Sequence, residues 1–180
     1  MSVLKIVTFP DSILREKSKE VEKIDENIRK IVDDMIETMI EYKGLGLAAI
    51  QVGIPLRIFI VDWKATGEDG ENENKEHDIR VFINPKILNL EEKFIMENEG
   101  CLSLPDLRAD IPRFYKAEIE AFDITGKKFK LKAEDVLSVA LQHEYEHLDG
   151  KLFIDKLSPV KRSFLLREYR KKRKRKKKSE

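Results

Sequence analysis

Residues 134–150 read Glu-Asp-Val-Leu-Ser-Val-Ala-Leu-Gln-His-Glu-Tyr-Glu-His-Leu-Asp-Gly, and the other segments are organised around this one. Positions with apolar or histidine side chains recur there at helical spacing, at i, i+4, i+7 and i+11: Val136, Ala140, His143 and His147. We therefore predict a helix over this stretch, with both imidazoles on its buried face. Gly150 stands where a glycine ends many helices.

Within this helix, His143, Glu144 and His147 form the pattern His-Glu-x-x-His. Two histidines one turn apart can bind the same metal ion, and a glutamate beside the first can act as a general base. The alternative is a buried helix whose histidines are satisfied by hydrogen bonds in the core. A metal site needs a third ligand, and no further histidine follows His147.

Cys101 is the only cysteine, and a free cysteine is usually a small buried hydrophobic residue. Gly100 before it and Pro105 after it indicate a turn that leaves a strand, which could direct a thiolate toward a metal. Two histidines, one cysteine and one open position are typical of a catalytic rather than a structural metal. These ligand types do not distinguish ferrous iron from zinc.

The composition limits the class of protein. The chain has 180 residues, 41% of them hydrophobic, which is enough for one domain with a core. It has no apolar run of about 18 residues, so we expect a soluble protein without a membrane span. The single cysteine and the absence of a signal-peptide pattern predict a cytoplasmic protein. No long apolar edge demands a partner, so we expect a monomer.

The net charge of +1 conceals a strong asymmetry. Residues 161–180 hold 12 Lys/Arg and 2 Glu, a net charge of +10, which leaves −9 on the remainder. We predict a domain over 1–158 and, over 159–180, a C-terminal helix that runs into a basic tail. Ser158 and Pro159 suit the start of that helix, whose apolar positions are Val160, Phe164 and Leu165. The alternative is a nucleic-acid-binding protein, although a tail without interspersed aromatic residues predicts phosphate affinity without sequence reading.

The remaining elements predict an α+β fold, with short, mostly antiparallel strands around the central buried helix. An amphipathic helix is predicted over 26–43, with Asp25 as its N-cap and Gly44 at its end. The polar stretch 64–79 is expected to be a loop, with His77 in solvent. Strands are predicted at 56–62, 81–83, 86–90, 94–99, 115–122 and 127–132, the last two as a hairpin.

Residues 44–53, Gly-Leu-Gly-Leu-Ala-Ala-Ile-Gln-Val-Gly, place one amide, Gln51, among small residues. The segment is no phosphate-binding loop, because it lacks Gly-Lys-Ser/Thr and a preceding strand. A tight loop packed under the core explains these residues as well as a binding site does. Gln51 is the residue to question, since a buried amide needs hydrogen-bond partners.

Three segments together resemble the signature motifs of the peptide deformylases, in that family's order and spacing. They are Gly44-Leu-Gly-Leu-Ala-Ala-Ile-Gln51, Glu99-Gly-Cys-Leu-Ser103 and Gln142-His-Glu-Tyr-Glu-His-Leu-Asp-Gly150. The resemblance extends from Phe9-Pro-Asp to Gly150-Lys-Leu-Phe153. It implies a metal-dependent hydrolase that removes the formyl group from N-terminal formylmethionine of nascent polypeptides, giving formate and a free N-terminus.

The resemblance also implies the roles of the site residues. Cys101, His143 and His147 bind the metal, which is Fe²⁺ in most members, with Zn²⁺ or another divalent transition metal as a substitute. Glu144 is the general base and acid, and Gln51 and the backbone N–H of Leu102 face the developing oxyanion. Residues that bind the extended substrate are Leu45, Gly46, Gly100 and Arg108, with Val136 and Val139 lining the methionine pocket. Glu99 and Arg113 are expected to pair behind the metal ligands.

Two further expectations follow from the resemblance. The family's third motif usually has Asp where this chain has Glu146, so we expect altered contacts behind the ligands, unless this side chain simply points to solvent. In this family a C-terminal helical extension docks on the ribosome, so ribosomal RNA is the expected partner of the basic tail. An amidase of the same fold that acts on a different acyl group is a further alternative.

Overall fold

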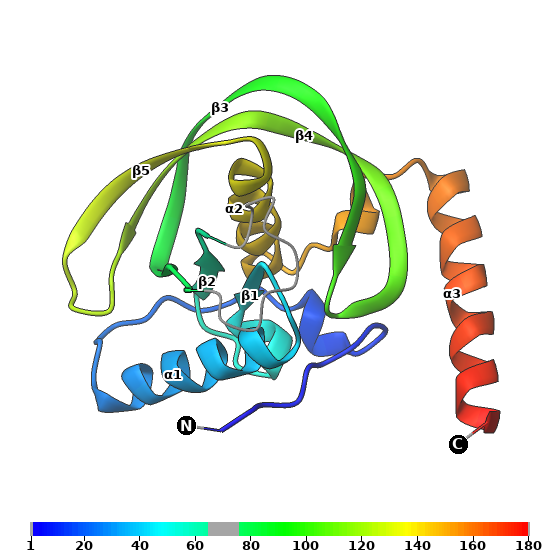
Figure 1. Cartoon of the computed structure of the whole chain (residues 1–180), viewed down its shortest axis with the longest axis horizontal. Coiled ribbons are helices and arrows are strands. Elements are labelled where there is room, and N and C mark those ends of the chain that lie inside the picture. Colours follow the sequence, from blue (N-terminus) through cyan, green and yellow to red (C-terminus); the bar gives the residue numbers. More distant parts are fainter. Residues whose placement is uncertain (1, 65–75, 180) are drawn as a thin grey trace.

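The computed structural model describes residues 2–64 and 76–179, with side chains as far as Arg175. A five-stranded antiparallel sheet of order β1-β2-β3-β4-β5 arches over α2, while α3 stands to one side (Figure 1). The strands are β1 (Gly46–Ala48), β2 (Ile58–Asp62), β3 (Ile79–Cys101), β4 (Leu104–Phe122) and β5 (Lys128–Glu134). The α-helices are α1 (Glu26–Glu41), α2 (Asp135–Leu148) and α3 (Pro159–Ser179), and the 3₁₀ turns are η1 (Ser12–Arg15), η2 (Ala49–Val52) and η3 (Phe153–Lys156). The predicted α+β fold with a central helix and a C-terminal helix is confirmed.

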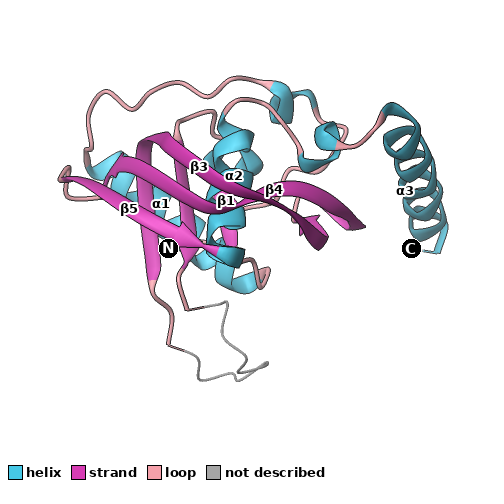
Figure 2. Ribbon diagram, turned by 90° about the horizontal axis from the view of Figure 1, so that it is seen from above, coloured by secondary structure: helices cyan, strands magenta, loops and turns pink. Residues whose placement is uncertain are grey.

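The strands are longer than predicted. The segments 81–83, 86–90 and 94–99 are parts of the single strand β3, and β4 begins at Leu104 rather than at residue 115. The register between β3 and β4 shifts at four places along their length. Such irregularities bend a strand and increase its twist. The long hairpin can therefore curve across α2 instead of lying flat, as seen from above in Figure 2.

The central position of α2 follows from its apolar residues. Ala140, Leu141 and Leu148 are buried against the inner side of β4 and β5. The helix ends at Leu148, and Gly150 has the predicted left-handed conformation, with φ of 67°. A Cβ at Gly150 would lie 2.4 Å from the backbone oxygen of Arg15, so this close approach requires glycine.

The first helix also matches its predicted pattern. The carboxylate of Asp25 accepts a hydrogen bond from the backbone N–H of Ile28, as expected of an N-cap. Buried side chains of α1 pack with those of β1 and β2 in one cluster. The helix ends two residues earlier than predicted, at Glu41, because Lys43 takes a left-handed conformation and Gly44 N–H bonds to Met39 O.

The contacts of α3 differ from the prediction. Val160 is 80% exposed and Phe164 is 54% exposed, whereas Tyr169 is only 3% exposed and packs beside Phe9. Within the charge run, Arg173 Nη1 donates to the backbone oxygen of Phe9 at 2.6 Å. The helix is thus fixed to the body through Arg173. Among the described residues, no helix is long and apolar enough to cross a membrane.

His77 is exposed, as predicted, but it also contacts a buried carboxylate that the sequence did not indicate. Its Nδ1 lies 2.6 Å from Oδ2 of the buried Asp62, and its side chain is 37% exposed. Residues 65–75 of the predicted loop lie outside the described part of the chain.

Candidate active site

The three predicted metal ligands converge beneath the arch of the sheet. Cys101 is the last residue of β3, and His143 and His147 lie one turn apart on α2. Their ligand atoms all lie within 4.8 Å of one another, and Cys101 Sγ is 3.2 Å from His147 Nε2. Both histidines are buried and the cysteine is half-buried. Residues far apart in the sequence therefore form one compact donor set.

A hydrogen bond prepares His143 to bind a metal. Its Nδ1 lies 2.7 Å from Oε1 of Glu99, and this carboxylate holds the ring proton on Nδ1. The lone pair of Nε2 is then free for a cation. A thiolate and two imidazoles suit ferrous iron and zinc alike. The residues present therefore fit a metal site of two histidines and one cysteine.

The protonation states of His147 and Glu99 agree with a metal site. Burial holds the pKa of His147 well below its usual value, so this imidazole is neutral. Burial alone would raise the pKa of Glu99. The hydrogen bonds from Arg113 and His143 outweigh burial and lower that pKa to about 2, so Glu99 is ionised at neutral pH.

The expected pair of Glu99 and Arg113 is present. Arg113 is 1% exposed, and its Nε and Nη2 donate to the two carboxylate oxygens of Glu99 at 2.8 and 2.5 Å. The third nitrogen, Nη1, donates to Glu146 Oε2 at 2.9 Å. The other oxygen of Glu146 lies 2.7 Å from Lys156 Nζ. Glu146 therefore binds two cations, and the alternative of a side chain that only faces solvent is wrong.

Glu144 lies beside the ligand set with its carboxyl group enclosed. The residue is 4% exposed, and burial raises its pKa to about 7. Its Oε2 is buried without a hydrogen-bond partner among the described residues. A Cβ at Gly46 would lie 2.7 Å from Oε1, so the strand β1 approaches this carboxyl closely. Such a group can both accept and release a proton near neutral pH.

The amide of Gln51 faces the cysteine. Its Oε1 accepts a hydrogen bond from Ala48 N–H at 2.8 Å, so Nε2 is directed toward Cys101 Sγ at 3.4 Å and Ser103 Oγ at 3.2 Å. Leu102 lies between these two residues, with its side chain beside Gly44. Ser103 is fully buried and was not predicted as a site residue. The only sequence signal for a role of Ser103 in the site was its position in the turn after Cys101.

The predicted substrate-binding residues come from two strands and a helix. Leu45 and Gly46 lie at β1, which is an edge strand of the sheet, and Leu45 O accepts from Asp62 N–H at 2.9 Å. Gly100 of β3 pairs with Arg108 of β4. The Arg108 guanidinium covers Gly100, since a Cβ there would lie 2.2 Å from Nη1.

The two predicted pocket residues of α2 differ in burial. Val139 is buried and Val136 is half-buried, one and two turns before His143. They lie on the helix that carries both histidines, so the structure brings them to the same element as the ligands.

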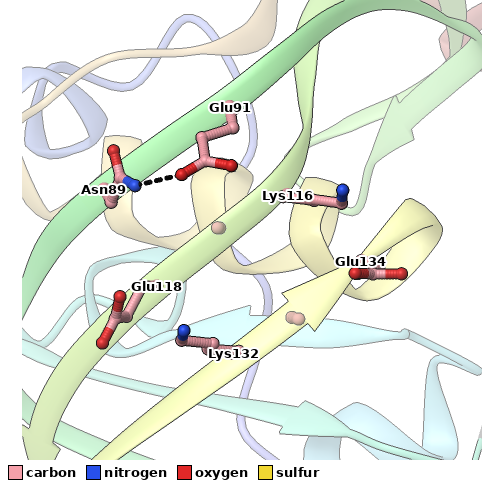
Figure 3. A pocket seen from close by; sticks show the side chains of 8 residues that line it. Asn89, Glu91, Lys116, Glu118, Lys132 and Glu134 are labelled. Atoms are coloured by element: carbon pink, nitrogen blue, oxygen red, sulfur yellow. Dashed lines mark hydrogen bonds between the residues drawn. The ribbon is translucent and has the colours of Figure 1, made fainter.

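A surface hollow lies apart from these residues, between β3, β4 and β5 (Figure 3). Ala117 and Ala133 pack into the core, so the residues on either side of them point away from α2. The charged and polar side chains that line the hollow are Asn89, Glu91, Lys116, Glu118, Lys132 and Glu134. None of them is a predicted site residue.

Comparison with known proteins gives consistent results. A profile of the polypeptide deformylase family matches residues 3–163. The peptide deformylase of Bartonella tribocorum is 43% identical over 176 residues, which cover 98% of this chain and 96% of that protein. A crystal structure of peptide deformylase from Ehrlichia chaffeensis is 42% identical, with a TM-score of 0.87 and coverage of 97% and 99%. A structure of the Ehrlichia chaffeensis peptide deformylase in complex with actinonin is 43% identical, with a TM-score of 0.85 and coverage of 96% and 98%.

Proposed function

The chain belongs to the peptide deformylase family, and on this premise we propose that it hydrolyses the N-formyl group of N-terminal formylmethionine in nascent polypeptides. The products are formate and a free N-terminus. Family membership makes the protein a hydrolase and implies a metal cofactor. The observation that carries the proposal is the convergence of Cys101, His143 and His147 with the buried carboxyl of Glu144.

Cys101, His143 and His147 would hold the metal, Fe²⁺ by preference, with Zn²⁺ or another divalent transition metal as a substitute. When bound, such an ion polarises the carbonyl oxygen and makes water acidic enough to attack at neutral pH. Glu99 fixes the His143 ring from behind, which keeps Nε2 in the orientation that a ligand needs.

Glu144 is proposed as the proton carrier. It takes the proton from the attacking water and delivers it to the leaving amine nitrogen. The pKa of about 7 suits both steps, because the group is easily converted between its two forms. The close backbone of Gly46 supports this role by confining the carboxyl on one side.

Two donors are proposed to stabilise the formyl oxygen as it gains negative charge. They are Gln51 Nε2 and the backbone N–H of Leu102. Support comes from the bond between Ala48 N–H and Gln51 Oε1, which orients the amide before substrate arrives. A donor that is already in place costs no reorganisation during the reaction.

Substrate recognition is proposed to use the free edge of β1. An extended peptide would bond to the backbone of Leu45 and Gly46 on one side and Gly100 on the other, as an added strand. Arg108, which covers Gly100, would contact the peptide backbone. Val136 and Val139 would wall the pocket for the methionine side chain.

We propose that residues 1–158 form the catalytic domain and that 159–180 dock on ribosomal RNA. The net charge of +10 on residues 161–180 supports phosphate contacts. We also propose that the enzyme acts in the cytoplasm, where nascent chains are made, and that it acts as a monomer.

One assay tests the central proposal: turnover of a formyl-Met peptide, with the metal content of the protein measured. Glu144→Gln should keep the metal and the fold while turnover falls about 10²-fold or more. Near-normal turnover in this variant would contradict the role of Glu144. Turnover of acetyl but not formyl peptides would indicate a different acyl group, and RNA binding without turnover would favour a nucleic-acid-binding protein.

A further inference from the structure

A continuous chain of charged side chains leads from the protein surface to the ring of His143. Lys156 Nζ lies 2.7 Å from one oxygen of Glu146, and the other oxygen accepts from Arg113 at 2.9 Å. Arg113 in turn donates two hydrogen bonds to Glu99, whose Oε1 lies 2.7 Å from His143 Nδ1. Each member thus contacts the next at hydrogen-bond or ion-pair distance.

The network joins four separate parts of the fold. Glu99 comes from β3, Arg113 from β4 and Lys156 from η3. Glu146 and His143 lie three residues apart on α2, a spacing that places two side chains on the same side of a helix. The chain of contacts therefore begins and ends on α2, and it fixes the sheet hairpin against that helix.

The length of Glu146 matters for these contacts. Its two oxygens reach two different cations, Arg113 on one side and Lys156 on the other. An aspartate would be shorter by one carbon–carbon bond, about 1.5 Å, so its carboxylate would not span the distance between both cations with the helix in the same place. The longer side chain of Glu146 and the amine of Lys156 thus match each other in position and charge.

Lys156 compensates the net negative charge of the buried group that it contacts. Arg113 is buried between the two carboxylates of Glu99 and Glu146, which together leave one excess negative charge. Lys156 neutralises that charge. Its side chain is 34% exposed, and ion pairs with such exposure contribute little to stability, so the pair matters mainly for where Glu146 and Arg113 are held.

We propose that Glu146 and Lys156 are positioning residues for His143. They hold the Arg113 guanidinium against Glu99, and Glu99 in turn fixes the orientation of the His143 ring. The consequence for metal retention rests on the proposed function. The consequence for the ring itself does not, because the hydrogen bond of His143 to Glu99 needs no metal.

The first experiment uses the metal-free full-length protein with ¹⁵N-labelled histidine. NMR measures the solvent exchange rate of the His143 Nδ1 proton, assigned with a His77→Gln variant. Glu146→Gln should accelerate exchange about threefold or more, because Arg113 loses a charged partner. Lys156→Met should have a smaller effect in the same direction. Lys156→Arg should restore the wild-type rate, and Lys151→Met, which removes an exposed charge five residues away, should leave it unchanged.

The second experiment measures zinc release from the loaded full-length protein to a chelator. Loss of a group behind a ligand typically costs 10- to 100-fold in affinity, so Glu146→Gln should release zinc about tenfold faster. Lys156→Met should have an intermediate effect in wild type and none in the Glu146→Gln background, since it acts through Glu146.

The outcomes separate the alternatives. A merely structural role would lower the melting temperature of the metal-free variants and leave exchange and release unchanged, which would overturn the proposal. Equal effects of Lys156→Met in both backgrounds would show that Lys156 acts through another contact and would also overturn it. A wild-type protein that retains neither zinc nor ferrous iron, but whose ring proton responds as expected, would contradict the proposed function and support the positioning role.

Discussion

Replacing Gly46 by alanine tests how closely β1 must confine the Glu144 carboxyl. The new Cβ would lie 2.7 Å from Glu144 Oε1, whereas ordinary contacts begin near 3.4 Å, so the carboxyl must retreat by about 0.7 Å. The backbone itself tolerates alanine, because Gly46 is not in a left-handed conformation. A misplacement of about 1 Å can cost about 10²-fold in rate, so we expect kcat to fall about 10- to 100-fold.

The assay measures kcat and KM separately on a short formyl-Met peptide, with metal content and melting temperature as controls. Metal content should stay at the wild-type level, because Gly46 contacts Glu144 rather than a ligand. The matched control is Glu144→Asp, whose shorter side chain leaves room for the new methyl group. In that background Gly46→Ala should cost less than about twofold. An undiminished loss there, or a rise in KM with kcat unchanged, would refute the steric argument and leave Gly46 as a substrate contact only.

Three further predictions concern the ligand, the tail and a surface ion pair. Cys101→Ser should weaken metal binding and lower the melting temperature, because a hydroxyl is a poorer ligand than a thiolate. If the variant retains as much metal after dialysis as the wild-type protein does, Cys101 is only a core residue. Deleting residues 174–180, which spares the Arg173 contact, should keep peptide turnover within about twofold of wild type. The same deletion should weaken ribosome binding about tenfold at low salt and make that binding less dependent on salt concentration. Unchanged ribosome binding would exclude the tail as the docking element. Burial raises the pKa of Asp155, but its bond with Arg15 outweighs this and the pKa is lowered below 3.8. The stability that the Asp155 carboxylate contributes is therefore present above about pH 4 and is lost as the pH falls through its lowered pKa. Asp155→Asn should lower the free energy of unfolding by about 1 kcal/mol at pH 7, measured by urea unfolding. The difference from wild type should vanish in strong acid.

The sequence predicted the helix α2 correctly, and it placed His143 and His147 one turn apart on that helix, because both features depend on local spacing. His143 and His147 must be one turn apart to share an ion, and the apolar residues around them repeat with the same period. Cys101 could be named as a partner because it is the only cysteine and follows a glycine. A site whose chemistry restricts both the types and the spacing of its residues can be predicted from the sequence alone.

The length of β3 could not be predicted, because its irregularities resemble strand ends. Asn84, Glu92 and Asn98 all have positive φ, which asparagine tolerates but which is rare in a strand. A turn and a bulge have the same local sequence signature, and only the pairing with β4 distinguishes them.

Contacts between distant segments were missed for a different reason. Tyr169 and Arg173 lie within a run of charges that predicts a solvated helix, but the chain at Phe9 happens to lie beside them. Lys156 was not recognised as a partner of Glu146, since a surface lysine carries no sequence signal for its neighbour. Such pairs exist only once the fold has brought them together.

The order of the strands has a consequence for how the protein is made. Every strand pairs with the strand that precedes it in the chain, so the sheet can assemble step by step as synthesis proceeds (Figure 1). The helix α2 leaves the ribosome after all five strands, and His147 follows Cys101 by 46 residues. Until that helix is inserted under the arch, Cys101 has neither histidine beside it. A chain whose synthesis stops before His147 therefore lacks one member of the donor set, so the set can form only after most of the polypeptide has been made.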